Sequence, residues 1–318
     1  MPRLNSTLVF IFFCLVILVF SGCSISKETD LYYPSSKVLS FGAVASVDVI
    51  PIVIGYEKGF FEDEGLKVQF QAFKNSKDRD AAFLSGNLDG IICDQIALCL
   101  YQNADFDVLI TGSTDGDFLL IANAQSGINS IDKIRGKRVA ISEKTAIEYT
   151  LDNILKKYGI SPESIEKTMI PAIPTRLEML RNHKVDAALL PEPFASLALK
   201  DGGILLGSAS KLGTYPSVTA FTQKSIHAKS DEIKSFYRGY NRAIDYIQHT
   251  PLDDYEEIVI KAVGYPENIR GNIRLPDYKK NTLPSEEELL SVIDWVNNYG
   301  LIRKELNPKT LINDIGFE

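Results

Sequence analysis

The chain has 318 residues, of which 45% are hydrophobic and 24% are charged, and its formal net charge is −7. This composition is typical of a globular protein with one large or two ordinary domains. A mildly acidic chain lacks the basic surface that nucleic-acid binding requires, so we expect no nucleic-acid partner.

Residues 1–22 are typical of a secretory signal peptide. Arg3 supplies a basic start, and the apolar run Leu8–Phe20 follows it. At about 1.5 Å per residue this run covers roughly 20 Å of a ~30 Å hydrocarbon core, which is too short to cross a membrane. Ser21 and Gly22 are small residues suited to cleavage.

Cys23 comes directly after this small pair, and the arrangement resembles a bacterial lipoprotein signal, whose cysteine is acylated and becomes the first residue. Such signals usually carry Leu three positions earlier, where this chain has Phe20. The resemblance implies lipidation at Cys23 and an extracytoplasmic protein attached to a bacterial membrane, in the periplasm or at the cell surface. Residues 23–36 are polar and predict a lipidated tether. The alternative is an uncleaved apolar anchor with an incidental Cys23.

From Val38 onward, short apolar runs alternate with helical stretches. This alternation predicts an α/β fold with mainly parallel sheets and helices on both faces. The expected strands are Val38–Val44, Lys67–Phe73, Leu88–Cys93, Asp107–Thr111, Phe118–Ala122, Lys137–Ile141, Lys167–Pro171, Val185–Leu190 and Ile204–Leu206.

Capping residues mark two helices. Thr145 and Glu148 have the spacing of a capping box, and the helix that they open should end at Gly159. Ser285 and Glu288 have the same spacing. From about Lys229 onward the pattern is nearly all helical.

The sequence carries no local catalytic motif. The strings GxGxxG, GxxxxGK[ST], HExxH and GxSxG are absent, and the three histidines are far apart. Cys93 and Cys99 have no metal-ligand spacing and are expected to be small buried residues, with a disulfide as the alternative. We therefore expect a binding protein without catalytic residues, cofactor or metal, although a catalytic site assembled from distant residues stays open.

An internal repeat joins two parts of the chain. The segment Leu84–Asp94 resembles Leu180–Pro191, and each predicts a helix end, a tight turn, an aspartate and a buried strand. Two α/β lobes that present equivalent strand ends suggest a cleft between them, because ligands of open α/β sheets bind beyond the carboxyl ends of the strands. Chance similarity of two helix–strand units is the alternative.

Several sequence segments resemble those of one family and occur in the same order as in its members. The family is the type II periplasmic-binding-protein fold in its nitrate, sulfonate, taurine and thiamine-pyrimidine branch. The most specific is Ile54–Val68, with the sequence IGYEKGFFEDEGLKV. The others are Leu84–Asp94, Ser126–Ile128, Gly136–Ala140, Asp186–Phe194 and Tyr215-Pro216.

The resemblance implies two lobes hinged by crossing strands at Phe118–Asn123 and Tyr215–Thr222. Lobe 1 would comprise residues 37–121 and 219–318, and lobe 2 residues 122–218. It also implies a solute-binding protein, expected to be a monomer, that closes over a small molecule and delivers it to the permease subunits of an ABC importer.

Matching positions in the family imply the ligand contacts. They are Ser46, Asp48, Asp94, Gln95, Ser113, Thr114, Thr145, Glu192 and Tyr215. Structural roles stay open for several of them, because Asp48, Asp94 and Thr145 could cap helices and Tyr215 could pack in the hinge.

Acidic residues outnumber basic ones in this set, and Lys144 is the nearest clear cation. Because an enclosed anion requires a partner, this balance favours a neutral or cationic nitrogenous ligand that resembles a pyrimidine. A sulfonate or nitrate is the alternative ligand. The alternative functions are an enzyme of thiamine or menaquinone synthesis on the same fold, and a ligand-sensing lipoprotein.

Overall fold

The structure is a computed structural model that describes residues 37–317. The expected signal peptide, the tether and the lipidation site Cys23 lie outside the described residues.

The first sheet is built from both ends of the described chain. Its spatial order is β2 (Lys67–Phe73), β1 (Val38–Val44), β3 (Gly90–Asp94), β10 (Ser217–Thr222) and β4 (Val108–Ser113). β1 pairs in parallel with β2 and β3, whereas β10 runs antiparallel to β3 and β4. β10 is therefore the one reversed strand of this sheet.

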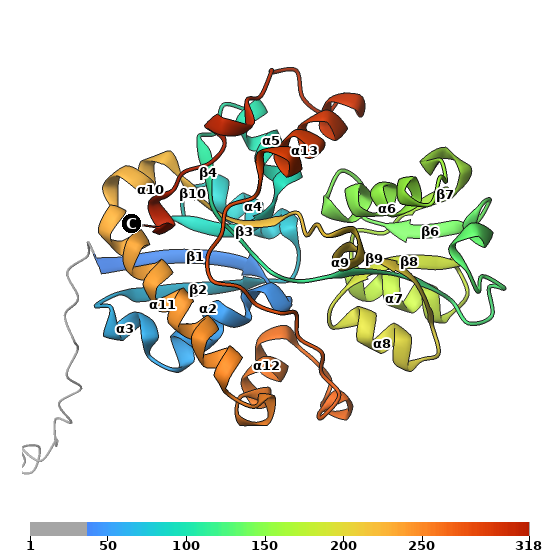
Figure 1. The fold of residues 1–318 in the computed structure, drawn as a ribbon, viewed down its shortest axis with the longest axis horizontal. Helices are drawn as coiled ribbons and strands as arrows, with labels where there is room; N and C mark the ends of the chain where they lie inside the picture. The colour runs from blue at the N-terminus through green and yellow to red at the C-terminus, as the bar shows by residue number, and fades with distance from the viewer. Residues whose placement is uncertain (1–36, 318) are drawn as a thin grey trace, which may run out of the picture. The chain divides into compact units, whose positions relative to one another are not determined.

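The second sheet repeats this topology with the middle of the chain. Its order is β7 (Glu166–Met169), β6 (Arg138–Ile141), β8 (Ala187–Pro191), β5 (Phe118–Ala122) and β9 (Ile204–Ser208). β5 is the reversed strand here, because it runs antiparallel to β8 and β9. Both sheets are mixed in pairing but mainly parallel in strand direction, and together they confirm the predicted two-lobed α/β fold (Figure 1).

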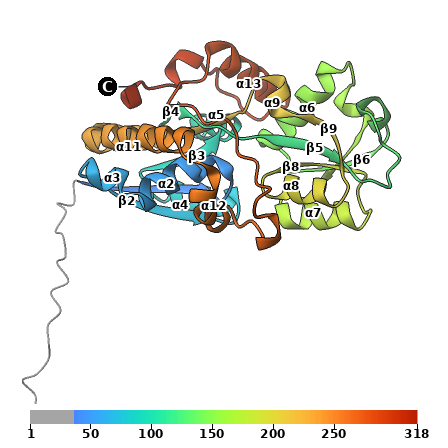
Figure 2. The same ribbon diagram turned by 60° about the horizontal axis from the view of Figure 1, so that its bottom comes forward.

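Helices cover both faces of each sheet (Figure 2). Around the first sheet they are α2 (Ile50–Glu57), α3 (Phe60–Asp63), α4 (Ser76–Leu84), α5 (Gln95–Asn103), α10 (Gln223–Ala228), α11 (Ser230–His249), α12 (Glu256–Val263) and α13 (Glu286–Asn298). Around the second they are α6 (Ala146–Lys157), α7 (Ile173–Arg181), α8 (Phe194–Lys200) and α9 (Ala209–Leu212). The helical pattern after Lys229 thus becomes helices of lobe 1, where α11 and α12 pack with α2 and α13 packs with α5.

The repeat seen in the sequence occupies equivalent places in the two lobes. Asp89, before β3, accepts a hydrogen bond from the backbone nitrogen of Ser40 on β1 at 2.8 Å. Asp186, before β8, accepts one from the backbone nitrogen of Arg138 on β6 at 2.9 Å. Each aspartate therefore fixes a central strand to its parallel neighbour.

Two short crossings, residues 114–117 and 213–216, join the lobes. They place the lobe boundaries before Phe118 and before Ser217, whereas the sequence places them after residues 121 and 218. Pairing explains the difference, since all of β5 pairs within the second sheet and all of β10 within the first. The crossings pack tightly: a Cβ atom on Gly116 would lie 2.4 Å from Cζ of Tyr215.

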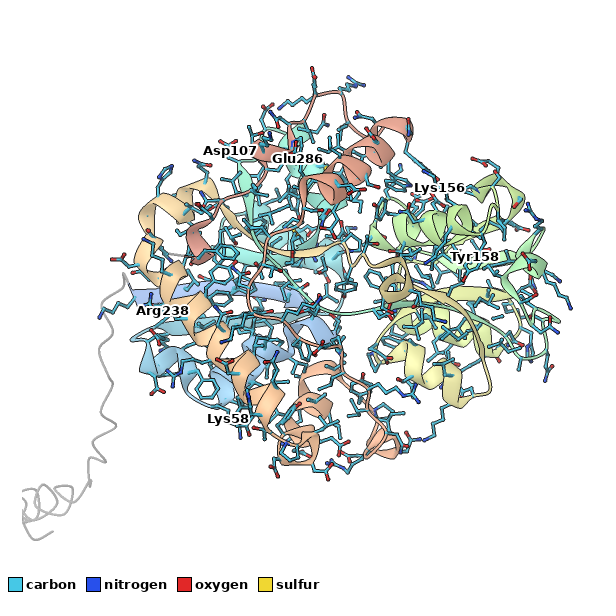
Figure 3. The ribbon with its side chains drawn as sticks, viewed as in Figure 1. Lys58, Asp107, Lys156, Tyr158, Arg238 and Glu286 are labelled. Carbon is cyan, nitrogen blue, oxygen red and sulfur yellow. The ribbon has the colours of Figure 1, made fainter. Side chains whose placement is uncertain are left out.

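Charged side chains such as Lys58, Lys156 and Arg238 lie at the surface (Figure 3), and apolar side chains fill the space between sheets and helices. Cys93 and Cys99 are free and buried, as expected. Within residues 37–317, no helix combines the length and the apolar character needed to cross a membrane.

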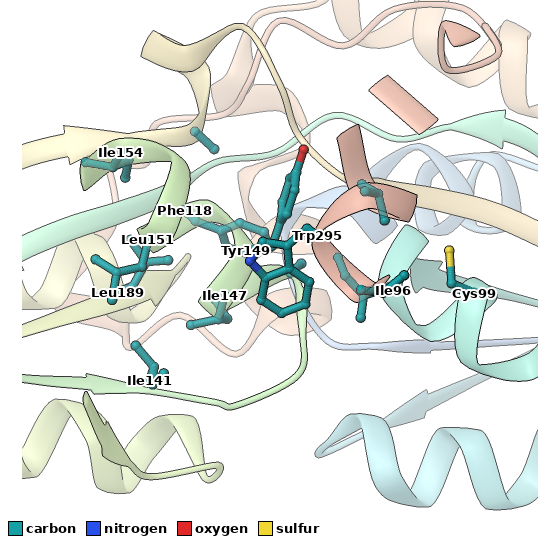
Figure 4. Packing of buried hydrophobic residues seen from close by; sticks show 14 of the residues in the cluster. Ile96, Cys99, Phe118, Ile141, Ile147, Tyr149, Leu151, Ile154, Leu189 and Trp295 are labelled. Carbon is teal, nitrogen blue, oxygen red and sulfur yellow. The ribbon is translucent and has the colours of Figure 1, made fainter. Parts of the chain in front are cut away.

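One apolar cluster continues from lobe 1 into lobe 2. Figure 4 shows Trp295 of α13 beside Tyr149 of α6, with Ile147 of α6 to one side and Ile96 and Cys99 of α5 to the other. Tyr149 meets the Trp295 ring edge to face at 5.8 Å.

Polar contacts lie beside this cluster. Asp152 of α6 accepts hydrogen bonds from Trp295 Nε1 at 3.0 Å and from the hydroxyl of Tyr299 at 2.5 Å. Lys167 of β7 pairs with Asp152 at 2.7 Å and with Glu148 at 2.8 Å. Helix α6 of lobe 2 is thus tied to the C-terminal part of lobe 1.

Candidate ligand-binding site

A cleft of about 520 Å³ lies between the lobes, at the carboxyl ends of their parallel strands. Lobe 1 contributes the ends of β1 and β3 and the start of α4, and lobe 2 contributes the starts of α6 and α7 and the end of β8. Its lining is Val44, Ala45, Ser46, Asp48, Lys74, Asn75, Ser76, Lys77, Asp78, Arg79, Ile92, Cys93, Asp94, Phe118, Ser142, Glu143, Thr145, Ala146, Ile147, Pro171, Ala172, Ile173, Arg176, Pro191, Tyr215 and Ser217.

The nine residues expected at the site divide between two cavities. Five of them line the cleft: Ser46, Asp48, Asp94, Thr145 and Tyr215. Gln95, Ser113, Thr114 and Glu192 line a second cavity of about 650 Å³ beside the crossings, together with Tyr215. We call this second cavity the hinge chamber.

Asp48 is a buried carboxylate at the cleft, 4% exposed. It accepts hydrogen bonds from the hydroxyls of Ser46 and, at 3.0 Å, Ser217. Burial raises the pKa of Asp48, although both hydroxyls favour its charged form. The positive charge of Arg79 also favours the charged form of Asp48.

Asp94 links the two lobes through its carboxylate. One oxygen caps α5 by accepting from the backbone nitrogen of Ala97 at 2.7 Å, and the other accepts from the backbone nitrogen of Ala146 at 3.3 Å. Burial raises the pKa of Asp94, and the hydrogen bond from Ala97 opposes that rise. Because Ala146 is the first residue of α6, a side chain of lobe 1 already occupies the positive end of this helix.

Thr145 caps α6, as its sequence position predicts, but no capping box forms. Its hydroxyl accepts from the backbone nitrogen of Ile147 at 3.2 Å. Glu148 instead accepts from the backbone nitrogen of Lys144 at 2.7 Å and pairs with Lys167. The side chain of Lys144 is exposed and does not line the cleft, so the expectation that it is the nearest cation is wrong.

The sequence did not reveal four cationic residues of the cleft, which are the exposed Lys74 and Lys77 and two buried arginines, one in each lobe. Arg79 of α4 donates to the carbonyl of Ile92 at 2.9 Å, and Arg176 of α7 donates to the carbonyl of Leu189 at 2.7 Å. Each arginine lies thirteen residues before its acceptor. Their equivalent places just before the two halves of the internal repeat are the signal that could have identified them.

The two arginines differ in their counter-ions. Although burial disfavours its charge, the carboxylate of Asp80 at 2.6 Å raises the pKa of Arg79. Arg176 is fully buried, its partners are carbonyls and the hydroxyl of Ser142, and no described carboxylate pairs with it. Burial therefore lowers the pKa of Arg176 to about 10.

Apolar groups complete the cleft. The Phe118 and Tyr215 rings lie at the hinge with their centroids 4.9 Å apart. Ile92, Ile147 and Ile173 add aliphatic surface from three different elements. Such a lining, with a few polar groups placed in it, suits a small organic molecule. No group of three or more His, Cys, Asp or Glu among residues 37–317 is arranged to hold a metal ion.

Two α/β lobes of identical sheet topology, with a ligand-sized cleft at their strand ends, define the class of two-lobed type II periplasmic binding proteins. The NMT1/THI5-like family model matches residues 46–253, so the chain belongs to this family.

Solved structures share the fold. The periplasmic aliphatic sulphonate binding protein SsuA of Escherichia coli superposes with a TM-score of 0.74 at 18% identity, over 87% of this chain and 92% of SsuA. The periplasmic nitrate-binding protein NrtA of Synechocystis PCC 6803 superposes with a TM-score of 0.68 at 12% identity, over 89% of this chain and 87% of NrtA.

Relatives in sequence include binding proteins and enzymes. A protein of Brucella abortus (strain 2308), named as a binding protein, is 22% identical over 299 residues, which cover 84% of this chain and 91% of the relative. The 4-amino-5-hydroxymethyl-2-methylpyrimidine phosphate synthase of Schizosaccharomyces pombe is 24% identical over 228 residues, which cover 66% of this chain and 65% of the enzyme.

Proposed function

We propose that the protein is an extracytoplasmic solute-binding protein that delivers a small organic molecule to the permease subunits of an ABC importer. The observation that carries this proposal is the cleft of about 520 Å³, whose walls come from both lobes and whose base holds the hinge residues Phe118 and Tyr215. A ligand that contacts both walls favours the closed arrangement, because it binds that arrangement more tightly than the open one.

We infer that the ligand is a neutral nitrogenous compound that resembles a pyrimidine. Four acidic residues of the lining (Asp48, Asp78, Asp94 and Glu143) balance four basic ones (Lys74, Lys77, Arg79 and Arg176). Equal numbers of acidic and basic residues favour a neutral ligand over an anion or a cation. The sequence predicted a neutral or cationic ligand, and we now propose the neutral one. The apolar walls and the Phe118 and Tyr215 rings suit a heteroaromatic ring.

The position of Asp94 supports a neutral ligand over a sulfonate or nitrate. Anions bind helix N-termini because free backbone N–H groups and the helix dipole face them. At α6 the carboxylate of Asp94 takes the N–H of Ala146. An anionic ligand there would meet a fixed negative charge.

Titration calorimetry tests the function and the ligand class together. We expect 4-amino-5-hydroxymethyl-2-methylpyrimidine to bind, with neither nitrate nor the sulfonate MOPS competing. Asp48→Ala should weaken binding by about ten- to a hundredfold, because a charge-assisted hydrogen bond is worth ~1.5–3 kcal/mol. Asp78→Ala, an exposed carboxylate at the rim of the cleft, is the matched control. Tight binding of MOPS or nitrate with the pyrimidine inert would refute this ligand class.

An enzyme acting on a thiamine- or menaquinone-pathway intermediate is the second candidate function. The similarity to the pyrimidine phosphate synthase of Schizosaccharomyces pombe favours it. Mass spectrometry of the pyrimidine recovered after incubation separates the two functions, since a binding protein returns it unchanged. A kinase gene beside this one, in place of permease and ATPase genes, would favour a ligand-sensing lipoprotein.

We also propose that Cys23 is the acylated first residue of the mature protein and that the protein works as a monomer. The apolar run Leu8–Phe20 and the small pair before Cys23 support the acylation. Labelling with palmitate should be lost in Cys23→Ser, and labelling that persists in the variant would exclude this site.

A further inference from the structure

The cleft and the hinge chamber lie on opposite sides of one layer of chain. Ser46 and Asp48 line the cleft, whereas Val47 between them lines the hinge chamber. Asp94 lines the cleft and its neighbour Gln95 the chamber. Pro191 and Glu192 divide in the same way. A single layer of residues at the strand ends therefore separates the two cavities.

Tyr215 lies at the boundary between the cavities. Among the described residues it alone lines both. Its ring packs on Phe118 at 4.9 Å and fills the space beside Gly116, where a side chain would collide with it. Tyr215 is therefore the one described side chain that the two cavities share.

Two buried polar side chains that line the hinge chamber each carry an oxygen without a hydrogen-bond partner. Gln95 and Thr114 are each 3% exposed. Neither Gln95 Oε1 nor Thr114 Oγ1 has a hydrogen-bond partner. Buried polar atoms in folded proteins are nearly always paired, and leaving one unpaired costs free energy. A hydrogen-bond donor in the chamber would satisfy the amide oxygen of Gln95, and the hydroxyl of Thr114 can accept from the same group.

Charge limits what that donor can be. The carboxylates that line the chamber (Asp115, Asp117, Glu192, Asp277 and Glu288) outnumber the cations (Lys211, Arg274 and Lys279). Glu192 is 8% exposed, and burial raises its pKa although Ser196 hydrogen-bonds its charged form. A further negative charge would be repelled here, whereas an O–H or N–H donor would find acceptors.

We propose that the hinge chamber is a second part of the binding site and takes a polar group that donates hydrogen bonds and carries no negative charge. Tyr215 is the partition between this chamber and the cleft. The inference rests on the proposed function of the cleft. The donor group belongs either to a substituent of the cleft ligand or to a separate small molecule.

Calorimetry with one series of pyrimidines tests the chamber. The parent is 4-amino-5-hydroxymethyl-2-methylpyrimidine, and its derivatives carry a 4-hydroxybutyl, a 4-aminobutyl or a 3-carboxypropyl chain on the hydroxymethyl oxygen. We expect the hydroxyl and amine chains to tighten binding about tenfold over the parent, and the carboxylate chain to weaken it. Equal affinities of the parent and all three derivatives would contradict the inference.

Variants of the chamber residues test which side chains produce the higher affinity of the hydroxyl and amine derivatives. Thr114→Val and Gln95→Leu should each remove most of the tenfold gain in affinity of the hydroxyl derivative over the parent. Thr214→Val is the matched control, because this threonine lines the same chamber and its hydroxyl is not among the unpaired buried atoms. Tyr215→Ala should increase the preference for the hydroxyl chain over the parent, and an unchanged preference would contradict the role of Tyr215 as a partition.

Free erythritol distinguishes the two sources of the donor group and needs no cleft ligand. If millimolar erythritol binds the wild type but not Thr114→Val, the donor group belongs to a separate small molecule. If only the tethered chains raise the affinity, the donor group belongs to a substituent of the cleft ligand. If no pyrimidine binds, the proposed ligand class of the cleft fails while the erythritol experiment still decides the chamber. Absence of both the chain effect and erythritol binding would overturn the inference.

Discussion

Arg79 and Arg176 hold equivalent places in the two lobes, but their charges are compensated differently. Arg79 has Asp80 beside it, whereas the fully buried Arg176 is held by carbonyls and one hydroxyl. A cation surrounded by neutral acceptors is costly to bury, and each acceptor it leaves behind would itself be unpaired. Arg176 is therefore a single residue on which the local structure of lobe 2 depends.

Arg176→Met should lower the free energy of unfolding by about 2–4 kcal/mol, because it leaves the carbonyls of Ile170 and Leu189 without a donor. Urea unfolding measures the loss. Arg181→Met on the same helix is the control, since Arg181 pairs with Glu178 and Asp201 near the surface and should cost under about 1 kcal/mol. Equal losses in the two variants would show that burial of Arg176 is not the cause.

Asp48 makes the free energy of unfolding depend on pH, because its carboxyl group is buried in the folded state. Burial raises its pKa in the folded state above the ordinary value of 3.8, so the folded state binds the proton more tightly than the unfolded state. Its contribution to stability is then fully present below pH 3.8 and is lost as the pH rises through the folded-state pKa. Asp48→Asn cannot titrate, so it should lack this loss.

Unfolding curves measured between pH 4 and pH 7 test the effect of Asp48. The stability of Asp48→Asn relative to wild type should increase as the pH rises through this range. Glu143→Gln, an exposed residue at the same cleft, serves as the control for a general effect of charge removal. A constant difference between Asp48→Asn and wild type at every pH would contradict the assignment.

Helices α6 and α13 provide one contact between the lobes outside the cleft. Asp152 of α6 accepts from Trp295 of α13 and from Tyr299 just beyond its end. Trp295 is the single tryptophan of the sequence, so its emission reports this contact directly. Because these hydrogen bonds converge on one carboxylate beside the apolar cluster, the contact can open and close as a unit when the lobes move.

Asp152→Asn should shift the emission of Trp295 to longer wavelength and weaken binding of the pyrimidine about three- to tenfold. The reason is that the neutral amide forms weaker hydrogen bonds with Trp295 and Tyr299, so the closed arrangement loses about 1 kcal/mol. Asp294→Asn, an exposed neighbour of Trp295, should change neither quantity. An unshifted spectrum in Asp152→Asn would mean that the contact does not depend on this carboxylate.

Closure of the whole molecule requires the two crossings to bend together. They already pack at contact distance, since Gly116 leaves no room for a Cβ beside Tyr215. A side chain at residue 116 would force the crossings apart and change the angle between the lobes. The hinge therefore constrains motion of the lobes through one glycine and one tyrosine.

Small-angle scattering of the mature chain tests this motion. Saturating pyrimidine should reduce the radius of gyration of the wild type, and Gly116→Ala should abolish most of that compaction. Thr214→Ala on the other crossing removes atoms without adding any, so it should compact like the wild type. A wild type that keeps its radius with ligand bound would exclude closure of the lobes.

The alternation of apolar runs with helical stretches predicted most strands to within about two residues, because strand and helix periods are local properties of the chain. The repeat and the capping residues Thr145 and Ser285 also lie where the sequence places them. Glu148 differs because its carboxylate accepts from the backbone nitrogen of Lys144 and pairs with Lys167 of β7, whereas a capping box would bond it to the backbone nitrogen of Thr145.

The residues that line each cavity could be predicted from the sequence less well than the strands and helices could. Sequence position identified residues at the ends of strands, and those residues do lie between the lobes. It could not divide them into two cavities, because adjacent residues such as Asp94 and Gln95 line opposite sides of one layer.

The sequence by itself determined the α/β class and the order of the elements, since these follow from periodicity and from a repeat within the chain, and its resemblance to the family implied the strand ends at which a ligand is expected. Only the tertiary structure decided the charge of the cleft. Arg79 meets Asp48 and Asp94 when lobe 1 folds, and Arg176 of lobe 2 joins the same lining only where the two lobes meet.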